Sequence, residues 1–148
     1  MNGSRIPVMI NGVHLLLGSA NPEADRAFFR DVLGFTHIDA GEGWLIFALP
    51  PAEMGIHPAE KNLTNLHAGQ NLAAGTLYLM CDNLGATLDA LAAKGVGHSQ
   101  IEEAGWGIAS SIPLPGGARL GLYEPHHPLA VSLGELKEQG QSREASHR

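Results

Sequence analysis

The hydrophobic and polar positions of this chain repeat one arrangement twice. Each copy has an apolar strand, an amphipathic helix that begins at Asn or Asp and ends at glycine, and a further strand. The helix-ending glycines, Gly34 and Gly95, occupy equivalent places in the two copies, and so do His37 and His98. A strand–helix unit used twice predicts two half-sheets that bury their apolar faces by meeting, with a site at the junction.

Each copy predicts one helix. The first is expected to begin at Asn21-Pro22, because an Asn cap followed by proline in the first helical position is a strong start signal. Gly34 ends this helix. Its apolar face carries Ala24, Phe28, Phe29, Val32 and Leu33. The second helix is expected from Asp82 or Asn83 to Gly95, with Leu84, Leu88 and Leu91 on one stripe.

Strand and loop signals fill the rest of the chain. Apolar runs at 13–17 and 76–81 precede the helices, and the run at 44–49 is apolar on both faces, which predicts burial between layers. After Pro50-Pro51, residues 53–57 are expected to resume as a strand. Residues 106–114 and 118–124 predict a hairpin around Pro115-Gly116-Gly117. Residues 59–73 predict a long polar connection, and 132–138 a helical turn. Trp44 and Trp106 are expected in the core and His126-His127 in a solvated turn.

Length, charge and cysteine content narrow the function classes. A chain of 148 residues is long enough for one domain with its own core. A net charge of −6 without a run of Lys or Arg argues against nucleic acid or acidic lipid as a partner. Cys81 is the single cysteine, so a disulfide framework is excluded. No targeting segment or membrane-spanning apolar stretch is evident, so we expect a soluble, cytoplasmic protein.

Three segments carry a resemblance to a known family. They are His14, the run Arg26-Ala27-Phe28-Phe29-Arg30-Asp31-Val32-Leu33-Gly34-Phe35, and Pro115-Gly116-Gly117 followed by Gly121-Leu122-Tyr123-Glu124-Pro125. Over residues 9–128 the chain resembles the vicinal oxygen chelate superfamily of glyoxalases, bleomycin resistance proteins and extradiol dioxygenases. The resemblance implies an α+β fold of two βαβββ modules, about 9–58 and 75–125, curled into a cup within a homodimer. Residues 129–148 would form a polar tail.

Strand alternation sorts side chains between the core and the cup, because successive residues point to opposite faces. Leu77, Leu79 and Cys81, and then Leu120 and Leu122, form core-like rows. The side chains expected to face the cup are His14, Leu16, Glu53, His57, Thr76, Tyr78, Met80, Arg119, Gly121 and Tyr123.

The metal positions implied by the resemblance are poorly filled. They correspond to His14, to His57 or Glu53, to Thr76, and to Gly121 or, with a slipped register, Arg119. Glu53 and His57 are separated by about 13 Å along a strand, too far to share one ion. Two plausible ligands fall short of the usual three, and an arginine in the cup would repel a divalent cation. We therefore expect no cofactor; the alternative is one divalent metal ion.

Three functions remain open from the sequence. The first is a metal-free small-molecule-binding protein that sequesters an antibiotic or metabolite, with Arg119 pairing an anionic or carbonyl group and Glu53 a donor or cation. The second is a lyase, isomerase or ring-cleaving dioxygenase, with His14 and His57 holding a metal, or His14 as general base without one. The third is an interaction domain with a filled cup. His14 as an interior histidine, Arg119 as a solvated charge and the tyrosines as packing aromatics are the alternatives for the single residues.

Overall fold

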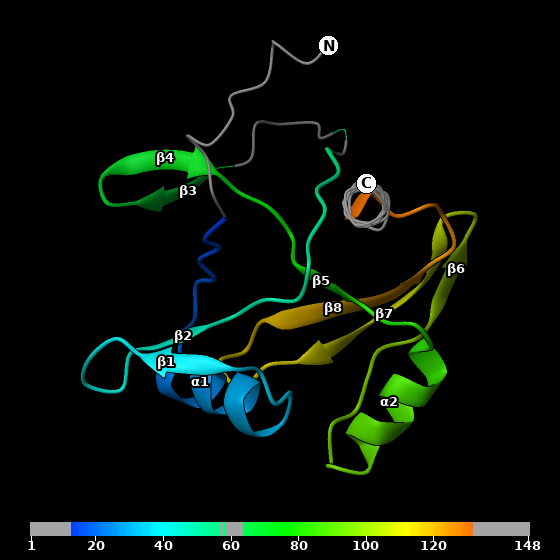
Figure 1. Ribbon diagram of the computed structural model, residues 1–148, viewed down its shortest axis with the longest axis horizontal. Helices are drawn as coiled ribbons and strands as arrows, with labels where there is room; N and C mark the ends of the chain where they lie inside the picture. Colours follow the sequence, from blue (N-terminus) through cyan, green and yellow to red (C-terminus); the bar gives the residue numbers. More distant parts are fainter. Residues whose placement is uncertain (1–12, 57, 59–63, 132–148) are drawn as a thin grey trace, which may run out of the picture.

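A computed structural model describes residues 13–56, 58 and 64–131 of the chain (Figure 1). Its elements, in chain order, are α1 (Pro22–Asp31), β1 (His37–Asp39), β2 (Leu45–Phe47), β3 (Thr64–His67), β4 (Gln70–Ala73), β5 (Tyr78–Met80), α2 (Leu84–Ala92), β6 (Glu102–Ala104), β7 (Gly107–Pro113) and β8 (Arg119–Pro125). No helix in these described ranges is long and apolar enough to cross a membrane.

Both helices begin and end where the sequence predicts. The Asn21 side chain accepts a hydrogen bond from the Ala24 N–H, and Asn83 accepts one from Ala86 in the same way, so each asparagine satisfies a free donor of the first turn. The chain turns out of the helices at Gly34 and Gly95, with φ of 71° and 81°. Only glycine adopts this left-handed conformation without steric cost, which explains both stop signals.

The second copy folds as the predicted βαβββ module. Its strands form one sheet in the order β5-β8-β7-β6, with β5 parallel to β8 and the other neighbours antiparallel. The β7–β8 hairpin closes around the predicted turn, where the Leu114 N–H donates to the Ala118 carbonyl at 2.8 Å. This order places both long strands, β7 and β8, in the centre of the sheet.

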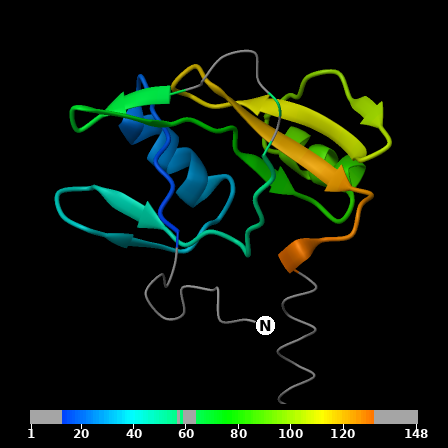
Figure 2. The ribbon, with the colours of Figure 1, turned by 90° about the horizontal axis from the view of Figure 1, so that it is seen from above.

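One core joins the two copies. Leu120 and Leu122 of β8 are 1% and 2% exposed, which confirms the predicted core side of this strand. They share a cluster with Ile112 and Leu114, with Leu84, Leu88 and Leu91 of α2, and with Phe28 and Phe29 of α1. Figures 1 and 2 show α1 beside the β1–β2 hairpin and α2 at the other end of the four-stranded sheet. Helices from both copies therefore cover the same apolar side of β7 and β8.

A buried carboxylate fastens the first helix to the second copy. Asp25 is 8% exposed, and its Oδ1 accepts a hydrogen bond from the Gly116 N–H at 2.7 Å, while Oδ2 accepts one from Ser19 Oγ at 2.6 Å. Gly116 lies in the turn between β7 and β8. A Cβ on it would come within 2.6 Å of both Asp25 Oδ2 and Ser19 Oγ, so only glycine permits this approach.

Two further polar contacts attach α2. The Leu84 N–H donates to Glu124 Oε1 at 2.9 Å, which places a carboxylate of β8 at the positive N-terminus of α2. At the other end, Lys94 Nζ donates to the Val32 carbonyl at 2.9 Å and connects the C-terminal ends of the two helices. Both contacts complement the helix dipoles and fix the helices relative to the sheet.

The first copy departs from the predicted pattern. Residues 13–18 form no strand and no backbone hydrogen bond with another described residue, and Val13 is 90% exposed. The predicted strand 53–57 is absent over 53–56, and His57 lies outside the described residues. The physical reason is that neither segment has a strand beside it among the described residues to satisfy its backbone groups, and an apolar pattern alone does not produce a strand.

The middle of the chain also differs. The strand within 44–49 is Leu45–Phe47, and β1 is its one partner strand among the described residues. Trp44 and Leu49 are exposed rather than buried between layers. The predicted polar connection 59–73 contains the β3–β4 hairpin, in which Ala68 and Gly69 form a tight turn with positive φ. Figure 1 shows this hairpin standing away from the four-stranded sheet. The predicted turn at 132–138 lies outside the described residues.

Replacing Asp25 should destabilise the whole domain. Asp25→Ala removes two charge-assisted hydrogen bonds and leaves the Gly116 N–H unpaired, which we expect to lower the free energy of unfolding by about 2–4 kcal/mol. Urea denaturation measures the loss. The matched control is Asp31→Ala on the same helix. Its exposed carboxylate bonds to no described residue except Arg30, so the free energy of unfolding should change by less than about 1 kcal/mol. Equal effects of the two variants would refute the role given to Asp25.

Glu124 should make stability depend on acid pH. Hydrogen bonds from His126 and from the Leu84 N–H hold the pKa of Glu124 below its ordinary value of 4.5. The Glu124 carboxylate is therefore harder to protonate in the native state than in the unfolded state. Its contribution to the free energy of unfolding is complete above the ordinary pKa and is lost as the pH falls through the lower pKa of the native state. We expect the difference in unfolding free energy between wild type and Glu124→Gln to shrink from about pH 6 to about pH 3.

The control for this measurement is Glu103→Gln, at an exposed position of β6. Its difference from wild type should stay nearly constant across the same range. A pH-independent difference for Glu124→Gln, measured by chemical denaturation at each pH, would show that the carboxylate charge does not support the start of α2.

Candidate functional site

The face of the sheet opposite the core carries most of the predicted site. On β8, Arg119 and Tyr123 alternate with the buried leucines, as strand alternation predicts. The parallel register places Tyr78 beside Gly121 and Met80 beside Tyr123. The side chains selected from two separate strands therefore lie on one surface.

Four rings gather on this surface, and we call Tyr78, Trp106, Tyr123 and His127 the aromatic face. The Tyr78 and Tyr123 rings meet edge to face with centroids 5.7 Å apart, and Trp106 and Tyr123 do so at 6.1 Å. The His127 ring is stacked against Tyr123. Tyr78 is 49% and Trp106 48% exposed, so the cluster presents aromatic surface to solvent rather than filling a core.

Hydrogen bonds fix the Tyr123 hydroxyl. The His127 Nδ1 lies 3.0 Å from the Pro128 carbonyl, which can only accept, so Nδ1 carries the ring proton. In the neutral ring, Nε2 then accepts the Tyr123 hydroxyl at 3.2 Å. Burial and, secondly, the negative charge of Glu53 raise the pKa of Tyr123. The hydroxyl is thus a neutral, oriented phenol at physiological pH.

Glu53 reaches this surface from the other copy. Its Oε1 accepts a hydrogen bond from the Ala130 N–H at 2.8 Å, just after the end of β8. Its charge acts on Tyr123, although 70 residues of sequence separate the two. Glu53 is therefore held near the end of β8 by a hydrogen bond that the alternation argument did not foresee, and its place in the site stays a prediction.

Arg119 lies at the other end of the same strand face. Its Nε donates to Ser111 Oγ at 2.8 Å and its Nη2 to the Ser111 carbonyl at 2.9 Å. Ser111 also lines a small cavity of about 160 Å³, together with Tyr78, Ser99, Gln100, Glu102, Ala109 and Ser110. The two hydrogen bonds to Ser111 therefore hold the Arg119 side chain against the sheet, so it does not extend freely into solvent.

The remaining predicted residues are placed differently from Tyr78, Arg119 and Tyr123 relative to this face of the sheet. His14 and Leu16 are exposed on the segment without a strand, and His14 makes no hydrogen bond with another described residue. Thr76 is exposed just before β5, Met80 is partly buried, and His57 lies outside the described residues. The structure therefore gathers Glu53, Tyr78, Met80, Arg119 and Tyr123.

Sequence reasoning missed two members of the aromatic face. Trp106 was expected in the core, and His127 in a solvated turn. Only His127 had a signal, because it has the same parity along the strand as Tyr123. The structure shows that the hairpin pairing extends until the His126 N–H donates to the Trp106 carbonyl at 2.8 Å. Trp106 already lay within the predicted strand 106–114, and no sequence pattern indicated that its ring would contact Tyr123.

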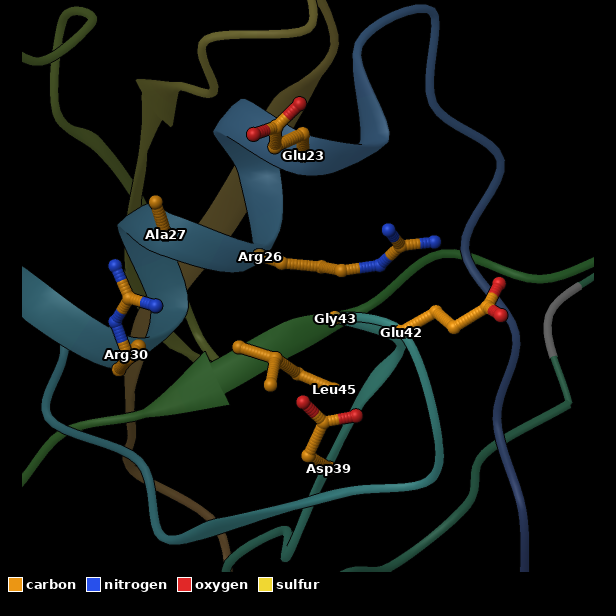
Figure 3. Close-up of a pocket in the computed structure, with 8 residues that line it drawn as sticks. All are labelled: Glu23, Arg26, Ala27, Arg30, Asp39, Glu42, Gly43 and Leu45. Carbon is orange, nitrogen blue, oxygen red and sulfur yellow. The ribbon is translucent and has the colours of Figure 1, made fainter.

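A second, larger cleft has a different character. It has a volume of about 410 Å³ and lies between α1 and the β1–β2 hairpin (Figure 3). Figure 3 shows Arg26 and Arg30 from the helix and the carboxylates of Asp39 and Glu42 from the hairpin around it. Five of its eight lining residues are charged, with both signs present, whereas most small-molecule sites are lined mainly by hydrophobic and aromatic side chains. The aromatic face is the better candidate.

No group of three His, Cys, Asp or Glu side chains that could hold a metal ion occurs within residues 13–56, 58 and 64–131. His57, one of the two predicted ligands, lies outside these ranges, so the expectation of a metal-free site stays a prediction.

Comparison with known proteins places this geometry in a family. The sequence pattern of the Glyoxalase/Bleomycin resistance protein/Dioxygenase superfamily matches residues 13–121. No curated protein matches the chain.

Solved structures share the fold. TnmS3, an antibiotic binding protein from Streptomyces sp. CB03234, is similar with a TM-score of 0.53 and 21% identity, over 79% of this chain and 98% of that one. Lactoylglutathione lyase from Agrobacterium tumefaciens gives 0.51 and 18%, over 81% and 96%. Identities this low establish a common fold and not a common activity. The family match covers well over half of the sequence, and the chain belongs to the glyoxalase/bleomycin resistance protein/dioxygenase superfamily.

Proposed function

We propose that this protein binds a small, planar, partly aromatic molecule on the aromatic face and does so without a metal ion. The observation that carries the proposal is the edge-to-face arrangement of Tyr78, Tyr123 and Trp106, with about half of Tyr78 and Trp106 left exposed. Rings locked against one another lose little freedom on binding and offer a flat apolar surface. The fold is shared with an antibiotic binding protein, which is consistent with this class of ligand.

The space above Gly121 supports a metal-free site. Gly121 corresponds to one of the metal-ligand positions that the family resemblance implies. A Cβ at this glycine would collide with the Tyr78 ring, so the ring occupies the volume that a ligating side chain would need. Thr76 stands at a second of the implied metal-ligand positions, and a threonine hydroxyl coordinates metal ions poorly. The residues present therefore fit an aromatic binding surface better than a metal centre.

The alternative is a lyase, isomerase or dioxygenase that depends on His14 and His57. His14 is exposed, and among the described residues it has no hydrogen-bond partner to orient its ring. A general base or metal ligand needs such orientation. The exposed position of His14 therefore favours the binding protein over the enzyme. His57 lies outside the described residues and does not enter this comparison.

We further propose a homodimer. Among the described residues, the outer edge of β5 has no strand beside it and residues 13–17 have no backbone hydrogen-bond partners, although Val13 and Leu15 to Leu17 carry apolar side chains. Val13, Met54 and Ile56 are 90%, 84% and 91% exposed. Open strand edges and exposed apolar segments of this kind are usually covered by another part of a protein. In a symmetric dimer, each subunit would cover the β5 edge and the apolar segment of its partner.

The binding proposal is tested with N-phenyl-1-naphthylamine, a neutral aromatic fluorophore, and chelator-treated protein. We expect saturable binding, weakened about 5- to 20-fold by Tyr78→Ala and by Tyr123→Ala, because each removes a ring from the contact surface. Trp44→Phe, which changes an aromatic side chain beside α1, is the control and should bind like wild type. Unchanged affinity in both tyrosine variants would overturn the proposal.

The dimer is tested by sedimentation equilibrium. The wild-type protein should sediment as a dimer. Leu15→Lys should shift the equilibrium toward monomer, because a charge would be buried in the contact between the two subunits. Asp31→Ala, at an exposed helix position, should leave the dimer intact. A monomeric wild type at tens of micromolar, on the order of transient affinities, would contradict the proposal.

A further inference from the structure

Arg119 is oriented with one edge of its guanidinium used and the other free. Its Nε and Nη2 donate to the side chain and the carbonyl of Ser111 at 2.8 and 2.9 Å. A guanidinium has five N–H donors, so three remain, on the end formed by Nη1 and Nη2. Neither ion pair found among the described residues involves Arg119, so no carboxylate there occupies this end.

A chain of serine hydroxyls holds Ser111, and the direction of each hydrogen bond can be assigned. Ser110 Oγ lies 2.9 Å from the Ser99 carbonyl, which only accepts, so Ser110 donates there. Ser99 Oγ therefore donates to Ser110 Oγ at 3.2 Å. Ser111 Oγ then donates to Ser99 Oγ at 3.1 Å and has a lone pair left for Arg119 Nε.

This assignment excludes a serine nucleophile in the cluster. Every hydroxyl proton is already donated to another oxygen of the cluster. His98 Nδ1 lies 2.6 Å from the Ser99 carbonyl and so carries a proton, which leaves it unable to act as a base toward Ser110 at 3.5 Å. The serines position the arginine, and the arginine is the group available to a ligand.

Charges of opposite sign lie at the two ends of the site. Arg119 is two strand positions, about 7 Å, from Gly121 and its covering Tyr78 ring, with the cavity lined by Ser111 alongside. The carboxylates are at the other end: Glu53 acts on Tyr123, and Glu102 pairs with Ala109, itself opposite Tyr123. A ligand ring on Tyr78 would therefore have a cation on one side and acids on the other.

We infer that Arg119, positioned by Ser111 and Ser99, binds the anionic group of the aromatic ligand, a planar carboxylate or a sulfonate. The inference rests on the proposed function and narrows its ligands to aromatic acids. The free end of the guanidinium offers two parallel N–H donors, the geometry that matches an oxyanion in a bidentate pair. Ser111 is a positioning residue: it does not touch the ligand, but it decides which edge of Arg119 faces it.

Two fluorophores that differ by one charge test the inference. 1-Anilinonaphthalene-8-sulfonate is N-phenyl-1-naphthylamine with a sulfonate added. We expect wild type to bind the sulfonate at least about tenfold tighter than the neutral probe. Arg119→Gln should abolish that preference, because it weakens binding of the sulfonate about tenfold more than binding of the neutral probe. Arg26→Gln, which removes an arginine beside the charged cleft at α1, is the control and should keep the preference.

The serine variants test the positioning role. Ser111→Ala should reduce the preference for the sulfonate about threefold, and Ser111→Thr, which keeps a hydroxyl, should restore it. A merely structural role would change both probes equally in both variants, and that result would overturn the positioning claim. If Arg119→Gln weakened the binding of both probes equally, or of neither, the proposal of an anion site at Arg119 would be overturned.

Failure of this inference differs from failure of the proposed function. If the neutral probe binds through Tyr78 and Tyr123 but the sulfonate gains nothing from Arg119, only the anion site is wrong. If the neutral probe does not bind, or binds without the tyrosines, the aromatic face itself is not the site and both proposals are wrong.

Discussion

The buried carboxylate of Asp25 is the contact on which the arrangement of the two copies depends. It connects the first turn of α1 to Gly116, in a turn 91 residues further along the chain. An acid buried to this extent must keep its hydrogen bonds, so α1 has one favourable position against the β7–β8 hairpin. That position brings Phe28 and Phe29 onto the leucines of β8. The apolar side of the sheet is thereby filled by helices, and the opposite side is left for the aromatic face.

The sequence predicts well where its signals are local. Asn caps, glycine stops, the Pro-Gly-Gly turn and the alternation of Leu120 and Leu122 each depend on neighbouring residues, and the structure has each of them. The strand expected at 13–17 depends on a partner strand, which no local pattern supplies, and it is absent. Asp25 was missed for a related reason: the partner of its carboxylate lies in the other copy.

The same distinction applies to the site. Alternation placed Tyr78, Arg119 and Tyr123 on one face, because parity along a strand follows from the sequence alone. It could not reveal that Ser111 holds Arg119, since that contact depends on the register between β7 and β8. His127 joins the face because the chain continues beyond the expected end of β8, and Trp106 joins it through a ring contact with Tyr123 at the start of β7. Within a superfamily whose members differ in chemistry, these non-local contacts carry the functional argument.

The central claim is that the aromatic face binds its ligand without a metal. The most direct test is to titrate N-phenyl-1-naphthylamine into protein shown by elemental analysis to be metal-free, and then into the same protein supplemented with zinc, manganese or ferrous iron. The account predicts one binding isotherm with the same dissociation constant in every sample. Binding that occurs only after a metal is added, with about one ion retained per chain, would contradict it and favour the metal-dependent enzyme.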